Sequence, residues 1–376
     1  MTKFVSALAT GSDWKDILAD VGAQLPEGDA QAGGLGLIYA TEPLADHFSD
    51  MMLTLRQRTG VKHWVGCVGC VGMGVCGQMG EYHDEPALSV LIAPWSEESF
   101  KVFPTVSSAD ALPDTLSGDW ASSYGPVFGL AHGDPRNRHL GEIVDALPTA
   151  GEGYFVGGLT SLSDTAIQVA DEPTGGGLSG VLISAEVPVM VTHSQGCSPV
   201  GPYHQVTAGE RSIVETLDNR PALDVLKEDI GEVLARDLNR IGGYIHVAMP
   251  VPGSDTGDYT VRNLVGIDPN GGMIAVGDDI HIGDRIMFVR RDPESAQKDF
   301  TERLTELKAR IGDTPVRGGL FVSCVARGAA MFGEAGREVG IIQDILGDFP
   351  LTGFYANGEF CGNRMYGYTG VLSVFL

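Results

Sequence analysis

The stretch GLGLIYA at residues 34–40 decides the fold of this 376-residue chain, because it begins a pattern that recurs. A short apolar run bounded by small residues is typical of a buried strand. Residues 44–58 follow with apolar side chains at helical spacing, and WVGCVGC at 64–70 is a second apolar run that breaks on glycine. A further strand, ALSVLIA, lies at 87–93. The local pattern is therefore strand, helix, glycine-broken strand and strand.

The same order of segments returns twice in the chain. The second pass comprises GPVFGLA (125–131), a helix over 140–147, YFVGGLTS (154–161) and GVLIS (180–184). The third pass comprises GLFVSCV (319–325), a helix over 340–346, PLTGFYANGE (350–359) and VLSVF (371–375). A strand–helix–strand unit usually forms a right-handed parallel crossover. The sequence therefore predicts an α/β fold with strand–helix–strand units repeated about three times.

Aligning the three passes predicts that their glycine-rich segments fall at corresponding places beside the sheet. Cys67 then corresponds to Gly158 and Phe354. Three residues further on, Cys70 corresponds to Asn357. The alternative explanation is a chance similarity among glycine-rich strands.

Two regions lie outside the three passes. Residues 1–32 are expected to form a strand and then a helix with one apolar face. Residues 244–290 consist of short apolar runs separated by turn residues, such as DPNGG at 268–272, and predict a mainly β insertion in the C-terminal half. An amphipathic helix is expected over residues 296–310.

Composition bears on the partners and the compartment. The formal net charge is −24 and there is no long basic run, so nucleic acid and anionic membranes are poor partners. No segment has the roughly 18–20 apolar residues of a transmembrane helix, and the apolar start at residues 4–8 is too short for a signal peptide. Six cysteines without a disulfide framework suit a reducing compartment. The expectation is a cytoplasmic protein without membrane insertion.

Cysteine supplies two candidate reactive sites. Cys67 and Cys70 form a Cys-x-x-Cys pair near Cys76, which could bind a metal or exchange thiols, or could be structural. The segment SQGC at 194–197 could place a nucleophile beside a histidine, but it lacks the Gly-x-Ser-x-Gly elbow. The alternative for this segment is a ligand-contacting or purely structural loop.

Positive and histidine side chains supply further candidates. Arg262, Arg327 and Arg364 lie near strand ends or turns of an acidic chain, where each could clamp a carboxylate or form a surface ion pair. His193 could ligate haem, although a lone histidine is more often a satisfied polar group. The sequence contains no Gly-Lys-Ser or Gly-Lys-Thr and so does not indicate a P-loop nucleotide site.

Several segments together resemble the FIST-domain family, a bacterial sensory module that also occurs in eukaryotic F-box proteins. The N-terminal part of the resemblance lies in GCVGC (66–70), GVLIS (180–184), SQGCSPVGP (194–202) and RPALD (220–224). The C-terminal part lies in VGIDPNGG (265–272), RD (291–292), SCVARG (323–328) and FYANGE (354–359). The resemblance covers nearly the whole chain, from about residue 33 onward.

The resemblance implies a FIST N-terminal domain over residues 33–220 and a FIST C-terminal domain over residues 221–376, after the N-terminal segment 1–32. It implies an intracellular sensor of a small ligand rather than an enzyme, with an amino acid or a similar polar metabolite as the ligand. Some family members look like haem-based nitric oxide sensors, so haem is an alternative cofactor, and a thiol-dependent enzyme is the other alternative. Family members often carry an output domain on the same chain. Here the signalling output is expected to be a separate protein.

Eight residues are expected to bind the ligand, and no metal or catalytic residue is assigned. They are Gln195, Gly196, Cys197, Arg262, Arg327, Asn357, Gly358 and Glu359. Glu359 would suit an ammonium group, and Arg262 or Arg327 a carboxylate. The corresponding positions of the other two passes do not hold a pair like Asn357 and Glu359. This pair is therefore the first place where a ligand is expected. One departure from the family pattern is Val325, which stands where the family usually has asparagine.

Overall fold

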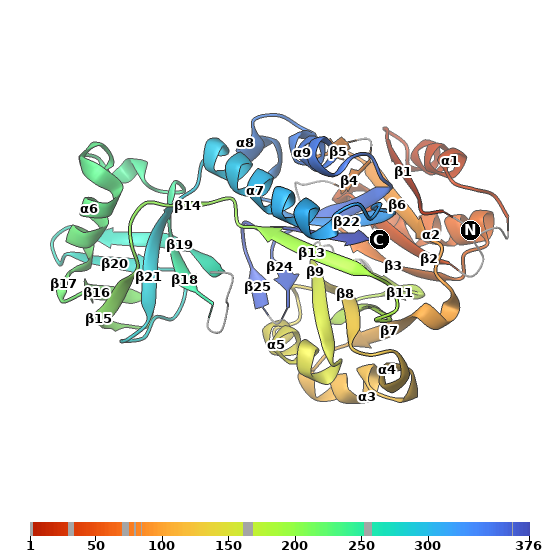
Figure 1. Cartoon of the computed structure of the whole chain (residues 1–376), viewed down its shortest axis with the longest axis horizontal. Helices are drawn as coiled ribbons and strands as arrows, with labels where there is room; N and C mark the ends of the chain where they lie inside the picture. The colour runs from red at the N-terminus through yellow and green to blue at the C-terminus, as the bar shows by residue number, and fades with distance from the viewer. Residues whose placement is uncertain are drawn as a thin grey trace. The chain divides into compact units, whose positions relative to one another are not determined.

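The computed structural model describes residues 3–28, 34–69, 75–78, 80–83, 85–160, 168–251, 258–362 and 364–376 (Figure 1). The chain forms two compact units. The larger unit contains Met1–Ser194 together with Thr301–Leu376, and the smaller unit contains Gln195–Phe300. Helix α7 (Pro293–Ile311) belongs in part to each.

The larger unit contains three six-stranded sheets built on one plan. At the centre of each sheet lies the parallel pair of one pass. These pairs are β2 (Leu35–Ala40) with β3 (His63–Val68), β8 (Val127–Gly133) with β9 (Gly153–Leu159), and β22 (Gly318–Cys324) with β23 (Leu351–Ala356). The helices between the paired strands are α2 (Phe48–Thr59), α5 (Leu140–Ala150) and α9 (Arg337–Leu346). The prediction of three strand–helix–strand passes is confirmed.

Two antiparallel strands follow on one side of each parallel pair. The inner of the two are β6 (Ala87–Ala93), β12 (Leu178–Ile183) and β26 (Gly370–Phe375). The edge strands are β1 (Val5–Thr10), β7 (Phe100–Val106) and β13 (Val189–Ser194). We call the sheet that contains β2 the first sheet, the one that contains β8 the second, and the one that contains β22 the third.

On its other side, each parallel pair is extended by a short hairpin that comes from a different pass. The hairpins are β4 (Val75–Gly77) with β5 (Gly80–Tyr82), β10 (Gln168–Ala170) with β11 (Glu172–Thr174), and β24 (Glu359–Cys361) with β25 (Arg364–Tyr366). The hairpin within pass one pairs with β23, the one within pass two pairs with β3, and the one within pass three pairs with β9. The exchange is cyclic, so no pass completes its own sheet.

In each parallel pair, a glycine allows its strand to come unusually close to the backbone of the neighbouring strand. A side-chain Cβ on Gly66, Gly157 or Gly353 would lie 1.8 Å from a carbonyl oxygen of the neighbouring strand. The residues that follow these glycines are Cys67, Gly158 and Phe354, as in the alignment of the three passes.

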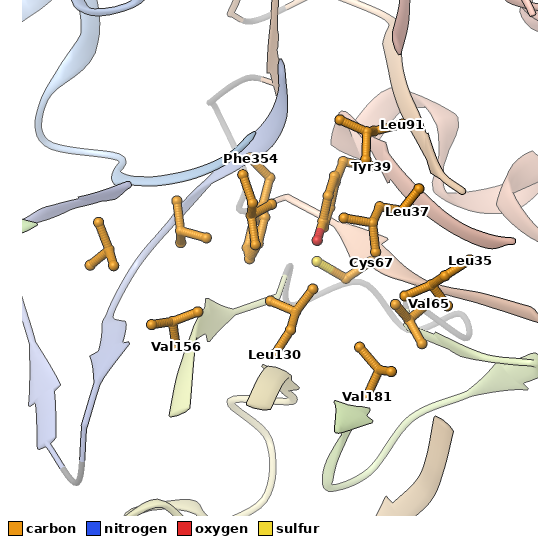
Figure 2. Packing of buried hydrophobic residues seen from close by; sticks show 14 of the residues in the cluster. Leu35, Leu37, Tyr39, Val65, Cys67, Leu91, Leu130, Val156, Val181 and Phe354 are labelled. Carbon is orange, nitrogen blue, oxygen red and sulfur yellow. The ribbon is translucent and has the colours of Figure 1, made fainter. Parts of the chain in front are cut away.

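The main core lies where the inner faces of the three sheets meet. Leu37 and Val65 of the first sheet face this core, together with Leu130 of the second sheet and Phe354 of the third (Figure 2). On the outer face of the first sheet, helix α1 (Trp14–Gln24) and α2 form a second core. Helices α3 (Leu112–Leu116) and α5 form another against the second sheet.

The smaller unit is mainly β, which confirms the predicted insertion. Its strands are β14 (Ser198–Pro199), β15 (His204–Glu210), β16 (Ile213–Leu217), β17 (Arg220–Pro221), β18 (Ile245–Pro250), β19 (Tyr259–Asp268), β20 (Met273–Val276) and β21 (Arg285–Arg290). The pairing of β21 with both β15 and β18 closes the sheet into a barrel. Helix α6 (Ala222–Ala235) packs its apolar face onto the barrel core. The short helices α4 (Asp119–Tyr124) and α8 (Gly328–Phe332) belong to the larger unit.

Candidate functional site

A row of residues in register crosses the second sheet near the carboxyl ends of β8 and β9. Neighbouring strands place Ser179 beside His132, His132 beside Gly158, and Gly158 beside Glu359. Residues that are direct partners across strands point to the same face of a sheet. Leu130 lies two residues before His132, and Val181 lies two residues after Ser179. Both belong to the main core, so the row also faces inward, because residues two apart on a strand share a face.

The first sheet contributes a matching row to the same interior. Tyr39 is the partner of Cys67, and Cys67 is the partner of Gln168 in β10. We call the five residues Tyr39, His132, Gln168, Ser179 and Glu359 the polar layer. Each of them is fully buried. The carboxyl ends of parallel strands are where ligands usually bind in α/β sheets, so this layer is the candidate ligand site.

Tyr39 and His132 join the first two sheets within the polar layer. The Tyr39 hydroxyl lies 3.1 Å from Nε2 of His132, and the Tyr39 ring stacks on Phe354 with centroids 4.9 Å apart (Figure 2). Burial lowers the pKa of His132 to about 3 and raises the pKa of Tyr39 well above its usual value. Both side chains are therefore neutral near pH 7 and act as hydrogen-bonding groups.

Three buried polar atoms of the layer have no hydrogen-bond partner among the described residues. They are Nδ1 of His132, Oε1 of Gln168 and Oγ of Ser179. The Gln168 side chain is held by its amide nitrogen, which donates to the carbonyl oxygens of His132 and Gly177. An unpaired buried polar atom costs about 1–3 kcal/mol. A bound polar molecule would supply the missing partners.

Glu359 adds a buried carboxyl group to the same layer. It is 0% exposed and accepts hydrogen bonds from the backbone nitrogens of Thr369 (3.1 Å) and Gly358 (3.3 Å) and from the Cys324 thiol. None of the described lysine, arginine or histidine side chains forms an ion pair with it. Burial raises the pKa of Glu359 to about 8. Because this pKa lies near neutral pH, the carboxyl group can gain or lose a proton when a ligand binds beside it.

The turn before Glu359 connects the layer to the surface. Asn357 is exposed, whereas Gly358 is buried with φ +135°, a conformation that favours glycine. The Gly358 carbonyl accepts a hydrogen bond of 2.9 Å from the backbone nitrogen of Leu159. Of the predicted pair, Glu359 therefore lies in the interior and Asn357 faces solvent.

Replacing Glu359 by glutamine should change how stability depends on pH. The folded-state pKa is raised to about 8, so the folded protein keeps a proton that the unfolded chain loses above its ordinary pKa of 4.5. The stabilising contribution of the protonated group is full below about pH 4.5, falls as pH rises, and is gone above about pH 8. In urea unfolding followed by circular dichroism, Glu359→Gln should remove this decline. Glu152→Gln, at an exposed carboxyl, should keep it; equal slopes in the two variants would contradict the assignment.

Arg327 lies close to Glu359 but is engaged by protein groups. Its Nε is 2.8 Å from Oε1 of Glu338, and its Nη1 is 3.2 Å from the Ser194 carbonyl oxygen. Glu338 also accepts a 3.0 Å hydrogen bond from the backbone nitrogen of Gly328. Both side chains are fully buried. This ion pair ties α8 and α9 to the third sheet.

The other predicted ligand residues belong to the smaller unit. Gln195 and Cys197 are buried there, and the Gly196 nitrogen donates to Asp299 at 2.9 Å. Arg262 pairs with Asp278 at 2.6 Å. The structure thus brings Arg327, Gly358 and Glu359 together in the larger unit. It describes Gln195, Gly196, Cys197 and Arg262 as a separate group, whose role in ligand binding stays a prediction.

Two of the thiols predicted as a possible reactive cluster are buried in different sheets. Cys67 lies in β3 of the first sheet and Cys76 in β4 of the third, while Cys70 lies outside the described residues. Burial raises the pKa of both described thiols well above the usual value. Because the thiolate is the reactive form, their surroundings disfavour redox or nucleophilic chemistry.

Sequence reasoning missed four members of the polar layer: Tyr39, His132, Gln168 and Ser179. A visible signal was the histidine at the carboxyl end of an otherwise apolar strand, GLAHG at 129–133. Gln168 and Ser179 gave no such signal, because their positions depend on strand pairing. Residues 70–74 and 161–167, which follow β3 and β9 in the sequence, lie outside the described residues.

Comparison with known protein families identifies the family of this chain. The family model of the FIST N domain matches residues 34–220, and that of the FIST C domain matches residues 222–362. The chain therefore belongs to the FIST family, whose domains are associated with sensing in signal transduction. The family boundary near residue 221 differs from the limits of the two compact units at 194 and 300.

The relatives found are mycobacterial. An uncharacterized protein of Mycobacterium tuberculosis is 31% identical over 323 residues, which cover 82% of this chain and 83% of the relative. An uncharacterized protein of Mycobacterium bovis is 28% identical over 360 residues, which cover 92% of this chain and 91% of the relative. Within the described residues, no helix has the length and apolar character needed to span a membrane.

Proposed function

We propose that the protein is a small-ligand-binding sensory protein of intracellular signal transduction, and that its ligand contacts the polar layer. One observation carries the proposal: three unpartnered polar atoms lie in the same buried layer as a carboxyl group with a raised pKa. Natural cores rarely leave buried polar atoms unpaired, and each exception calls for an explanation. A polar ligand at the carboxyl ends of the strands supplies one.

The chemistry of the layer favours an amino acid or a similar polar metabolite that carries an ammonium group. The ammonium would lie against Glu359 and drive its ionisation, because an adjacent cation lowers the pKa of a carboxyl group. His132 and Ser179 can each donate or accept a hydrogen bond, and Oε1 of Gln168 accepts one. Signalling through a separate output protein then requires that the ligand bind one conformation more tightly than another.

Thermal unfolding against a panel of amino acids and related metabolites tests this proposal. A ligand present at 100 times its dissociation constant should stabilise the protein by about 2.7 kcal/mol. An ammonium ligand should also release a proton from Glu359 near pH 7. Its calorimetric binding enthalpy should therefore depend on the ionisation enthalpy of the buffer in the wild type, but not in Glu359→Gln.

Two serines give a matched pair of variants for the same experiment. Ser179 and Ser373 both have a buried hydroxyl oxygen that finds no hydrogen-bond partner in the described part of the chain, but Ser373 lies in the third sheet and outside the polar layer. Ser179→Ala should weaken binding by several-fold, the equivalent of a lost hydrogen bond of about 1 kcal/mol. Ser373→Ala should leave binding unchanged. Equal affinity in the two variants, or no stabilising compound in the panel, would remove the support for this site.

A further inference from the structure

A cavity of about 830 Å³ opens at the other end of the same strands. Its lining includes Val127 and Phe128 at the start of β8, and Gly153 and Tyr154 at the start of β9. It shares no lining residue with the polar layer, which lies at the carboxyl ends. Its volume is within the range of about 300–1,000 Å³ that is usual for small-molecule sites.

The lining of this cavity is partly polar and partly apolar, and its apolar part is continuous with the main core. Val187, Val189 and Val191 line it, and all three are half-buried side chains that pack against that core. Phe128 is a member of the core and also lines the cavity. Tyr154 is 45% exposed, and its hydroxyl lies 2.9 Å from the Cys361 thiol. The apolar surface here is open to a ligand instead of being covered by a helix or strand.

One cation on the rim forms no ion pair with any carboxylate among the described residues. Arg310, in the last turn of α7, is exposed, and no ion pair or hydrogen bond to it is found among the described residues. Glu152, also exposed on the rim, is the only carboxylate among the described lining residues.

We propose that this cavity binds a small amphipathic carboxylate, such as a medium-chain or aromatic acid. The apolar body would pack against Phe128 and the valines, and the carboxylate would bind the Arg310 guanidinium, whose paired N–H groups match carboxylate geometry. This site is separate from the one in the proposed function, because it lies at the amino ends of β8 and β9 and selects an anion. Failure of either proposal leaves the other intact.

Calorimetric titration of the whole chain with decanoate tests the proposal. We expect saturable binding to the wild type and a loss of about two- to fivefold in affinity in Arg310→Met, as for an exposed ion pair. Glu152→Gln should tighten binding, because it removes a like charge from the rim. Ala185→Trp should abolish binding, since Ala185 is an exposed lining residue where an indole would fill the cavity.

Two controls separate this site from others. Arg303→Met alters a half-buried arginine of the same helix that pairs with Glu306 and does not line the cavity, so decanoate should bind it as it binds the wild type. Ser179→Ala, in the polar layer, should also leave decanoate binding unchanged. The absence of saturable binding to the wild type would overturn the proposal, and so would equal affinity in Arg310→Met or binding that survives Ala185→Trp.

Discussion

Gly353→Ala should unfold the protein or remove most of its stability. A Cβ at this position would lie 1.8 Å from the carbonyl oxygen of Phe321 and 2.8 Å from the Cys76 sulfur. The first of these atoms is backbone in the centre of a sheet and cannot move without breaking the pairing of β22 with β23. We therefore expect a loss above about 4 kcal/mol, which is exceptional for a single substitution. Urea unfolding followed by circular dichroism measures it.

A second glycine provides the control for this experiment. Gly340 lies inside α9, and a Cβ there would meet no other atom within 4 Å. Gly340→Ala should raise stability by about 0.5–1 kcal/mol, because alanine loses less backbone freedom than glycine when a helix forms. If Gly353→Ala cost less than about 1 kcal/mol, the close approach of β22 and β23 described above would be wrong.

Arg327→Met should destabilise the protein by about 3–5 kcal/mol, because it leaves a buried carboxylate without its cation. The remaining Glu338 is fully buried, and burial already raises its pKa. In the variant that pKa should rise further, so stability should fall as pH increases above the unfolded-state value. The measurement is the urea midpoint at several pH values.

Variants at Arg337 and Glu338 provide the controls for the substitution of Arg327. Arg337 lies beside Glu338 in sequence and makes only a long, exposed pair with Asp344 at 3.9 Å, so Arg337→Met should change stability by at most about 0.5 kcal/mol. The double variant Arg327→Met with Glu338→Gln should regain part of the loss, since no buried charge then remains unpaired. A double variant as unstable as the sum of the two single variants would argue against a direct pair.

The three passes were predictable because most residues of their strands are buried on both faces, so each strand shows as a short run of apolar residues and glycine. The exchanged hairpins were not, because their strands are three residues long and carry no periodicity. Pairing β4 with β23 joins segments from opposite ends of the chain. No local pattern in either segment indicates such a partner.

In the candidate site too, some residues could be predicted from the sequence, and others depend on strand pairing. Glu359 was predictable as a carboxylate that the repeat does not explain. Gln168 reaches the layer only because β10 pairs with β3 of another pass. Likewise, Arg262 and Arg327 were predicted as ligand residues because both are cations near strand ends or turns, whereas each forms an ion pair within its own compact unit. Register and pairing decide which side chains meet, and neither can be obtained from residue types alone.

The cyclic exchange of hairpins has a consequence for the order in which the protein matures during synthesis. The first sheet has all its strands once Thr174 has been made. The second needs β24 and β25, and the third needs β26, so neither sheet has all its strands until residues 359–375 have been made. Pairing between such distant segments slows folding. We infer that a nascent chain exposes the unpaired edge of β9 until β24 has been made, and that residues 359–375 complete two sheets late in synthesis.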